Sequence, residues 1–422
     1  MRRTVHLSAR LASVRRASSA ASAASHKPPS DVSVYVHWPF CTAICPYCDF
    51  NRYLDRDVDH SAMCASLLRQ INAFVGPRGL LPGRAVKSIF FGGGTPSLAK
   101  PSTIAAVISH VRSVAGTTTD DLEVTMEMNP TSVEIQRLEE FAHAGVNRVS
   151  IGVQSLIDAD LSYLGRRHTA KEAVHAVELA CRIFPYVSLD LIYARHRQQT
   201  VQSWRQELQA ALALGTRHMS LYQLTLHPGT SFHRRSQSQG GGVALPLSDS
   251  IADMYEVNIE ECSRMGLQQY EVSNFAVPGE ESRHNLQYWS AGDYIGVGPG
   301  AEGCFTDNAG TTWHTRAIRK PAPWLASLAD GGLGLDMHES VPMDDILSNA
   351  LIAAMRTLKG LPHGRFLQLS RGRSMHEVLD MDFVQRAQAG GLIVLDAAGL
   401  RPTQRGLAVA DAILRDLTPA RS

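Results

Sequence analysis

The feature that most constrains this chain is the segment Cys41-Thr-Ala-Ile-Cys45-Pro-Tyr-Cys48, which holds three of the seven cysteines. It follows an apolar run, residues 32–36, that we expect to form a strand. Thiolates are soft ligands for iron and zinc. Three of them on one short loop can meet at one metal centre, so the segment predicts a metal site built almost entirely by local sequence.

Three interpretations of the cysteine segment compete. A structural zinc site takes four ligands, and His37 could complete a Cys3His set, although no second CxxC pair follows. A [4Fe–4S] cluster also takes four ligands, so three cysteines would leave one iron open, which marks a reactive site. We favour the cluster over zinc. Unligated thiols fit poorly, because the triplet lies among prolines and aromatic residues where a strand ends.

At these residues the chain resembles the radical S-adenosylmethionine superfamily, whose motif is this triplet with an aromatic residue, here Tyr47, between the second and third cysteines. The lead Tyr35-Val-His-Trp-Pro-Phe and the tail Asp49-Phe50 are similar to the branch that contains oxygen-independent coproporphyrinogen III oxidases and HemW heme chaperones. The resemblance covers residues 32–414. It implies a [4Fe–4S] cluster whose metal ligands are Cys41, Cys45 and Cys48, with exchangeable S-adenosylmethionine at the open iron.

Strand-like and helix-like patterns alternate between residues 32 and 226. The predicted strands are 32–36, 88–91, 122–128, 148–153, 187–193 and 219–224, and the predicted helices are 57–74, 101–114, 132–144, 170–183 and 201–214. Repeating strand–helix units predict a parallel sheet with right-handed crossovers. Six units are too few for an eight-stranded barrel. The resemblance implies an α/β fold built on an open, partial (β/α)6 barrel.

Polar or glycine-rich residues follow most of the predicted strands. Chemistry in parallel α/β barrels gathers at the C-terminal strand ends, so we expect these residues to share one rim. Taken alone, residues 92–95 equally suit a tight turn, and Glu127 equally suits a salt bridge; no GxxxxGK[ST] nucleotide loop is present. The resemblance implies that the S-adenosylmethionine contacts are Tyr35, Tyr47, Gly93, Gly94, Thr95, Glu127, Gln154, Arg166, Asp190 and Leu224.

A second motif, His284-Asn-Leu-Gln-Tyr-Trp289, lies well after the barrel pattern. On chemistry alone, a buried histidine beside packed aromatic rings is the simpler interpretation. The resemblance to the HNxxYW motif of the chaperones implies a heme contact at His284.

The chain departs from the branch in places, among them His227, where relatives often carry glutamate. After Asp190 the branch usually has a Gly-Leu-Pro-Gly turn, whereas residues 194–197 here are Ala-Arg-His-Arg. Glu302 stands where relatives usually have histidine in a Gly-Pro-Gly-Ala-His-Gly segment. We expect the loop after the fifth strand to differ, on the adenosine side of the pocket.

Two functions compete for this chain. One is a heme chaperone, whose partners would be heme, heme-accepting proteins and an electron donor. The other is oxidative decarboxylation of coproporphyrinogen III to protoporphyrinogen IX. Oxidases usually carry a fourth cysteine two residues after the third, where this chain has Phe50. Oxidases also extend ahead of the cysteine motif with substrate-binding segments. Both points favour the chaperone, and the sequence leaves open whether any substrate is turned over or the chain forms a homodimer.

Residues 1–30 hold six of the 41 basic residues and no acidic one, which is typical of an organellar transit peptide, mitochondrial before plastid. The remaining 35 basic and 40 acidic side chains give a formal charge of −5, which argues against nucleic-acid binding. No apolar run reaches the roughly 20 residues of a membrane helix. The other cysteines are scattered, which predicts a reducing compartment without disulfides.

We expect four segments along the chain. They are the transit peptide at 1–30, the radical S-adenosylmethionine core at 31–240, a barrel extension with the HNxxYW motif at 241–340, and a C-terminal domain at 341–422. The last resembles the small winged-helix-like α+β domain of the branch, with a helix at 345–358, a hairpin at 392–403 and a closing helix at 405–417. Its acidic residues favour a structural cap over a DNA-binding role.

Overall fold

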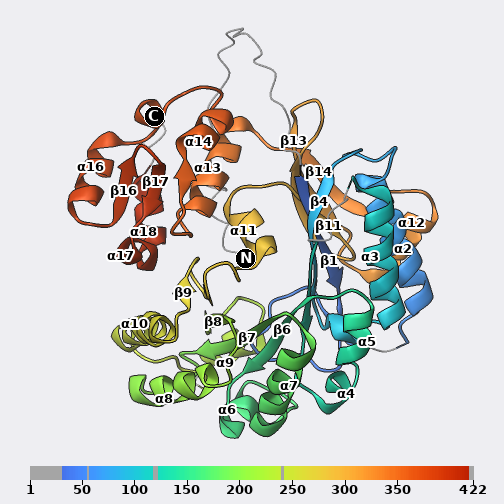
Figure 1. The fold of residues 1–422 in the computed structure, drawn as a ribbon, viewed down its shortest axis with the longest axis horizontal. Helices are drawn as coiled ribbons and strands as arrows, with labels where there is room; N and C mark the ends of the chain where they lie inside the picture. Colours follow the sequence, from blue (N-terminus) through green and yellow to red (C-terminus); the bar gives the residue numbers. More distant parts are fainter. Residues whose placement is uncertain (1–30, 55–56, 117–121, 239–241, 418–422) are drawn as a thin grey trace.

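The computed structural model of the protein describes residues 31–54, 57–116, 122–238 and 242–417, so the predicted transit peptide lies outside the described residues. The main feature is one sheet of twelve strands in the order β14-β13-β12-β11-β1-β4-β5-β6-β7-β8-β10-β9. Figure 1 shows this sheet curving, with most helices on its outer side and α11 (Arg283–Trp289) on its inner side.

Six parallel strands form the centre of the sheet and confirm the predicted open, partial barrel. They are β1 (Asp31–Trp38), β4 (Ala85–Gly93), β5 (Glu123–Met128), β6 (Arg148–Gln154), β7 (Tyr186–Tyr193) and β8 (His218–Gln223).

Each central strand alternates between two kinds of side chain. In β5, for example, Val124 and Met126 are fully buried, whereas the alternate residues Glu123, Thr125 and Glu127 are polar. Alternate residues of a strand point to opposite faces of the sheet. The apolar face packs under the outer helices, and the polar face lines the inside of the curve.

The outer helices complete the strand–helix units. They are α2 (His60–Val75), α3 (Pro101–Val114), α4 (Ser132–Ile135), α5 (Leu138–His143), α6 (Asp158–Tyr163), α7 (Ala170–Ile183) and α8 (Val201–Leu212), followed by α9 (Ser231–Ser236) and α10 (Ser248–Arg264). A short 3-10 turn, η2, covers Pro96–Leu98.

The predicted single helix 132–144 is two helices, α4 and α5. The break lies at Gln136 and Arg137, and the Arg137 guanidinium donates to the carbonyls of Ser97 and Ala99 at 3.0 and 2.9 Å. These bonds tie the chain between the two helices to the loop after β4.

Shorter strands, which were not predicted, extend the sheet at both edges. β11 (Tyr294–Val297) pairs in parallel with β1, and β12 (Glu302–Thr306), β13 (Thr312–Ala317) and β14 (Leu335–Ser340) continue antiparallel, with α12 (Pro321–Ala329) between the last two. At the other edge β10 (Asn274–Ala276) and β9 (Gln268–Gln269) follow β8. A separate pair, β2 (Phe40–Cys41) and β3 (Tyr53–Leu54), brackets the cysteine loop.

The C-terminal residues have a hydrophobic core of their own. Their helices are α13 (Met343–Ala354), α14 (His363–Leu369), α15 (Met375–Val378), α16 (Met381–Ala389), α17 (Gln404–Ala408) and α18 (Ala410–Asp416). The predicted hairpin is β16 (Ile393–Asp396) and β17 (Gly399–Pro402), joined by β15 (Leu361–Pro362), while the predicted closing helix is broken at Val409.

The C-terminal part packs against the sheet extension. Arg365 donates to the carbonyl of Ala291 at 2.7 Å, and Gln404 donates to Gln269 at 2.7 Å. Within the residues that the structure describes, none of the helices combines the length and apolar character that crossing a bilayer requires.

Candidate functional site

Cys41 is the last residue of β2, and Cys45 and Cys48 lie on the loop between β2 and β3, beyond the C-terminal end of β1. Cys41 is buried, and the other two are half-buried. The loop turns at Cys45, whose carbonyl accepts a hydrogen bond from the amide of Cys48 at 3.2 Å. Burial chiefly raises the pKa of Cys48 to about 11, and Cys45 and Cys41 add to the rise, so the three thiols share one neighbourhood.

The donor set fits an iron–sulfur cluster. Nowhere in the described ranges do three His, Cys, Asp or Glu side chains converge as ligands of a single metal ion. A cluster needs a different arrangement, because each thiolate binds a different iron. Burial raises the pKa of Cys41, while a hydrogen bond with Thr95 and the charges of Arg52 and Arg166 oppose the rise, so two cations lie near this thiol.

His37 is not free to complete a Cys3His zinc site. Its Nδ1 lies 3.0 Å from the hydroxyl of Tyr35, and its Nε2 lies 2.8 Å from the carbonyl of Asn51. Nδ1 thus contacts a residue of the same strand, and Nε2 joins the strand to the cysteine loop, so the zinc alternative loses its fourth ligand.

The glycine-rich segment packs directly against the cysteine loop. The amides of Gly94 and Thr95 donate to the carbonyls of Trp38 and Phe40, both at 2.8 Å. A Cβ on Gly93 would lie 2.4 Å from the His37 ring, and a Cβ on Gly94 would lie 2.7 Å from the Phe40 carbonyl oxygen. No side chain fits at either position, so close packing requires glycine at both, and the φ of +112° at Gly93 adds to the requirement there.

Glu127 and Asp190 face the inside of the barrel. Glu127 accepts from the amide of Gly93 at 3.1 Å, and Asp190 accepts from the hydroxyls of Ser150 and Ser188 at 2.8 and 3.2 Å. Burial, followed by the charge of Asp190, raises the pKa of Glu127 to about 8. Burial also raises the pKa of Asp190 to about 6. At neutral pH Glu127 is therefore largely protonated in the absence of a ligand.

Arg166 connects three parts of the rim. Its Nη2 donates to the carbonyl of Gly152 at 2.9 Å and to Oδ1 of Asn129 at 2.5 Å, and its Nη1 donates to Sγ of Cys45 at 3.6 Å. Asn129 in turn donates to the hydroxyl of Thr95 at 3.2 Å. Asn129 was not among the predicted contacts, although its position directly after β5 was the available signal.

Tyr222 lies on β8, which pairs with β7, the strand that carries Asp190. Burial raises the pKa of its hydroxyl well above the ordinary value, and the charges of Asp190 and Glu127 add to the rise. The Tyr222 hydroxyl therefore lies in the neighbourhood of both carboxylates.

Tyr47 and Leu224 belong to a small apolar cluster behind the cysteine loop. The ring of Tyr47 lies 6.4 Å from that of Phe232, whose amide donates to the carbonyl of Pro46 at 2.9 Å. Helix α9, which carries Phe232, thus supports the loop from behind.

Gln154, the last residue of β6, has a φ of +68°, which is unusual for a residue other than glycine.

His284 does not lie with the cysteines at the rim. It is 1 % exposed on α11, its Nδ1 is 2.9 Å from the Ser88 hydroxyl, and its Nε2 is 2.9 Å from the Tyr288 hydroxyl. Its amide donates to Glu123, the first residue of β5, at 3.0 Å. The histidine therefore lies towards the N-terminal ends of the strands, and burial lowers its pKa to about 3. In this conformation both ring nitrogens are occupied, so the heme contact stays a prediction.

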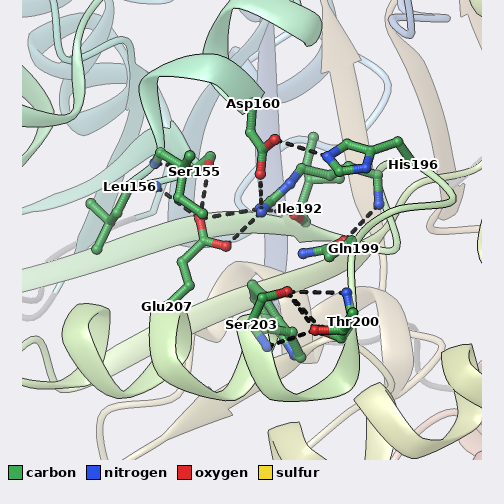
Figure 2. A network of polar contacts seen from close by, with 12 residues as sticks. Ser155, Leu156, Asp160, Ile192, His196, Gln199, Thr200, Ser203 and Glu207 are labelled. Atoms are coloured by element: carbon green, nitrogen blue, oxygen red, sulfur yellow. Dashed lines mark hydrogen bonds and ion pairs between the residues drawn. The ribbon is translucent and has the colours of Figure 1, made fainter.

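The loop after β7 begins with the four residues that depart from the usual turn of the branch. Ala194, in the place of the usual glycine, has a φ of +55°. Arg195 follows it and is 1 % exposed. Figure 2 shows the polar contacts around this point, which join Asp160, Glu207 and the carbonyl of Ile192.

An open parallel barrel with a cysteine triplet at its polar rim defines the class of radical S-adenosylmethionine proteins. Residues 35–198 match the family model of the Radical SAM superfamily, and residues 341–409 match that of the HemN C-terminal domain.

Comparison with curated proteins identifies the branch. Radical S-adenosyl methionine domain-containing protein 1, mitochondrial, from Bos taurus is 40 % identical over 91 % of this chain and 87 % of its own length. The protein of the same name from Dictyostelium discoideum is 36 % identical over 91 % and 93 %. Heme chaperone HemW from Escherichia coli is 36 % identical over 81 % and 86 %. The chain belongs to this family of the radical S-adenosylmethionine superfamily.

A solved structure shares the fold over nearly the whole length. Coproporphyrinogen III oxidase (HemN) from Escherichia coli superposes with a TM-score of 0.75 at 21 % identity, covering 93 % of this chain and 91 % of that one. At this identity the likeness establishes the fold alone.

Proposed function

We propose that this chain is a heme-binding chaperone that carries heme and transfers it to acceptor proteins. Its similarity to the proteins named heme chaperone HemW supports this proposal. The observation in the chain that carries it over an oxidase is Phe50, which stands where oxidases usually have a fourth cysteine. Phe50 is 52 % exposed beside the cysteine loop. A phenyl ring offers neither a ligand nor a proton there.

Cys41, Cys45 and Cys48 would hold a [4Fe–4S] cluster, with S-adenosylmethionine beside it at the rim. The chemistry that such a cluster supplies when bound is the electron that cleaves the sulfonium carbon–sulfur bond. The protein's share is positioning and exclusion of water. Whether this chain turns over a substrate with that chemistry is a separate question from heme binding.

The rim residues suit the parts of S-adenosylmethionine. Glu127 and Asp190 can accept hydrogen bonds from ribose hydroxyls, and a carboxylate also offsets the positive sulfonium. Because ligand-free Glu127 is largely protonated at neutral pH, a cationic ligand would favour its deprotonation. Leu224, 3 % exposed, would contribute an apolar contact to the adenosine side.

Heme binding at His284 would require a change at α11. The imidazole must release Ser88 or Tyr288 before a nitrogen can reach iron. Tyr288 is the freer of the two partners, because it is half-buried, whereas Ser88 is fully buried in β4. We therefore propose that heme engages His284 through the nitrogen now bonded to Tyr288. Acceptor proteins and an electron donor are the further partners of this proposal.

The oxidase is the second candidate, because the fold is shared with HemN. The test is anaerobic reconstitution of the cluster, followed by heme titration, transfer to an apo acceptor, and a parallel incubation with coproporphyrinogen III and S-adenosylmethionine. Heme binding and transfer with no decarboxylated product would support the chaperone. Protoporphyrinogen IX above the level of a reaction without S-adenosylmethionine would refute it.

We propose that the chain acts in the mitochondrion, since four relatives from animals and an amoeba are named mitochondrial. None of these names supports the plastid alternative. Residues 1–30 fused to a fluorescent protein should direct it to mitochondria, and a cytosolic signal would contradict the proposal.

A further inference from the structure

A buried ion cluster lies behind the rim, centred on Arg195. Its Nη2 donates to Oδ2 of Asp160 and to Oε2 of Glu207, both at 2.5 Å, and its Nη1 donates to Oε1 of Glu207 at 3.2 Å. Asp160 comes from α6 and Glu207 from α8. Figure 2 shows the two carboxylates approaching from opposite sides. One buried guanidinium thus holds two helices to the loop after β7.

The same cluster holds the ends of two central strands. Glu207 Oε1 accepts from the hydroxyl of Ser155 at 2.5 Å and from the amide of Leu156 at 2.9 Å, directly after β6 (Figure 2). Arg195 Nη1 donates to the carbonyl of Ile192, near the end of β7, at 2.8 Å. Ser155 follows Gln154, and Ile192 lies two residues after Asp190. Both of these strand ends carry predicted S-adenosylmethionine contacts.

Each strand end also carries a strained backbone beside the cluster. Gln154 has a φ of +68° and Ala194 a φ of +55°. Residues other than glycine seldom adopt this conformation, and it persists only where the surroundings hold it. Gln154 directly precedes Ser155, and Ala194 directly precedes Arg195. The ion cluster therefore holds the neighbours of both strained residues.

We propose that Arg195, together with Asp160 and Glu207, is a positioning residue that fixes the ends of β6 and β7 for S-adenosylmethionine. The inference rests on the proposed binding of S-adenosylmethionine at this rim. A planar guanidinium can serve two carboxylates and a carbonyl at once, which a lysine ammonium cannot do with the same geometry. Arg195 touches no ligand in this role and acts through Gln154 and Asp190.

The test compares Arg195→Met and Arg195→Lys with a matched control, Arg84→Met. Arg84 forms an equally buried pair with Asp293, at the start of β4 and away from the rim. Each reconstituted full-length variant is assayed for iron per chain, thermal midpoint and S-adenosylmethionine affinity by equilibrium dialysis. We expect both Arg195 variants to keep their iron and to bind S-adenosylmethionine about tenfold more weakly, or worse. Arg84→Met should lose thermal stability but bind as the wild type does.

The lysine variant retains a charge between the carboxylates, so it keeps the test valid if Arg195→Met fails to fold. The double variant Arg195→Met/Glu207→Gln removes one positive and one negative charge together, so it tests the loss of the hydrogen-bond geometry without leaving Glu207 as an unpaired buried charge. It should recover thermal stability but not affinity. Wild-type affinity in the lysine variant or in the double variant would overturn the inference. If the wild type itself binds no S-adenosylmethionine, the proposed S-adenosylmethionine site at the rim fails first and this inference fails with it.

Discussion

The Nη1 atom of Arg166 lies 3.6 Å from Sγ of Cys45, which places a half-buried cation beside one thiol of the cysteine triplet. A hydrogen bond to a charged group contributes about 1.5–3 kcal/mol. We therefore expect Arg166→Met to lose a reconstituted cluster to a chelator about tenfold faster than the wild type. The exposed neighbour Arg167 supplies the control variant Arg167→Met. Equal rates of iron loss in the two variants would contradict this role.

The cysteine triplet should account for all the bound iron. Cys41→Ala, Cys45→Ala and Cys48→Ala are each expected to abolish the brown colour and the iron of the reconstituted protein, because a cluster with two protein ligands is poorly held. Cys181→Ala is the control, since that thiol is exposed and distant in sequence from the loop. Full iron content in any variant of the triplet would sink the assignment of that cysteine.

Glu127 should make the stability of the ligand-free protein depend on pH. Its pKa is raised from 4.5 to about 8, so between these values the folded state holds a proton that the unfolded state releases. Stability from this group therefore falls as pH rises through that window. We expect the thermal midpoint of Glu127→Gln to fall less than that of the wild type over the same range. The exposed Glu139→Gln should follow the wild type, and parallel curves for all three proteins would refute the shift.

Gly93 should be intolerant of a side chain for steric reasons. Gly93→Ala and Gly83→Ala share the cost of a positive φ, at +112° and +75°. An alanine Cβ at position 93 would lie 2.4 Å from the His37 ring, whereas nothing lies within 4 Å of a Cβ at position 83. We expect Gly93→Ala to cost about 1–3 kcal/mol more in urea unfolding than its partner. Equal losses would show that the backbone conformation alone sets the requirement.

Heme titration of two α11 variants tests the engagement of His284. His284→Ala removes the proposed iron ligand, whereas Tyr288→Phe removes only the hydroxyl that occupies Nε2. If heme binds this nitrogen, the first variant binds more weakly and the second at least as tightly as the wild type. Weaker binding in Tyr288→Phe, or unchanged binding in His284→Ala, would place the iron elsewhere. Cluster content should be the same in both variants.

Much of the barrel could be predicted because its strands follow a simple rule. In β5 the alternation of Val124 and Met126 with Thr125 and Glu127 separates a helix-covered face from a polar one. The predicted rim residues meet because parallel strands end on the same side. The short strands of the extension escaped prediction, since runs of two to six residues such as β9 and β12 carry little pattern.

The Arg195 cluster marks the limit of such reasoning. The sequence identified residues 194–197 as unusual, but not what they contact. Asp160 is 35 residues before Arg195, and Glu207 is 12 residues after it. These separations along the sequence match no helix or strand period, and charged side chains are usually found at the protein surface. Only the fold, which brings α6 and α8 to the loop after β7, reveals that Asp160 and Glu207 meet at the buried Arg195.

The position of β1 has a consequence for the order in which the protein assembles. Strand β1 lies between β4 and β11, and Asn51 on the cysteine loop donates to the carbonyls of Pro299 and Arg319, both at 2.9 Å. The first strand and its loop thus gain their final neighbours from residues made more than half a chain later. Contacts so distant in sequence slow folding. The three thiols leave the ribosome long before the strands and loops that surround them are made, so we expect the proposed cluster to be inserted late in maturation.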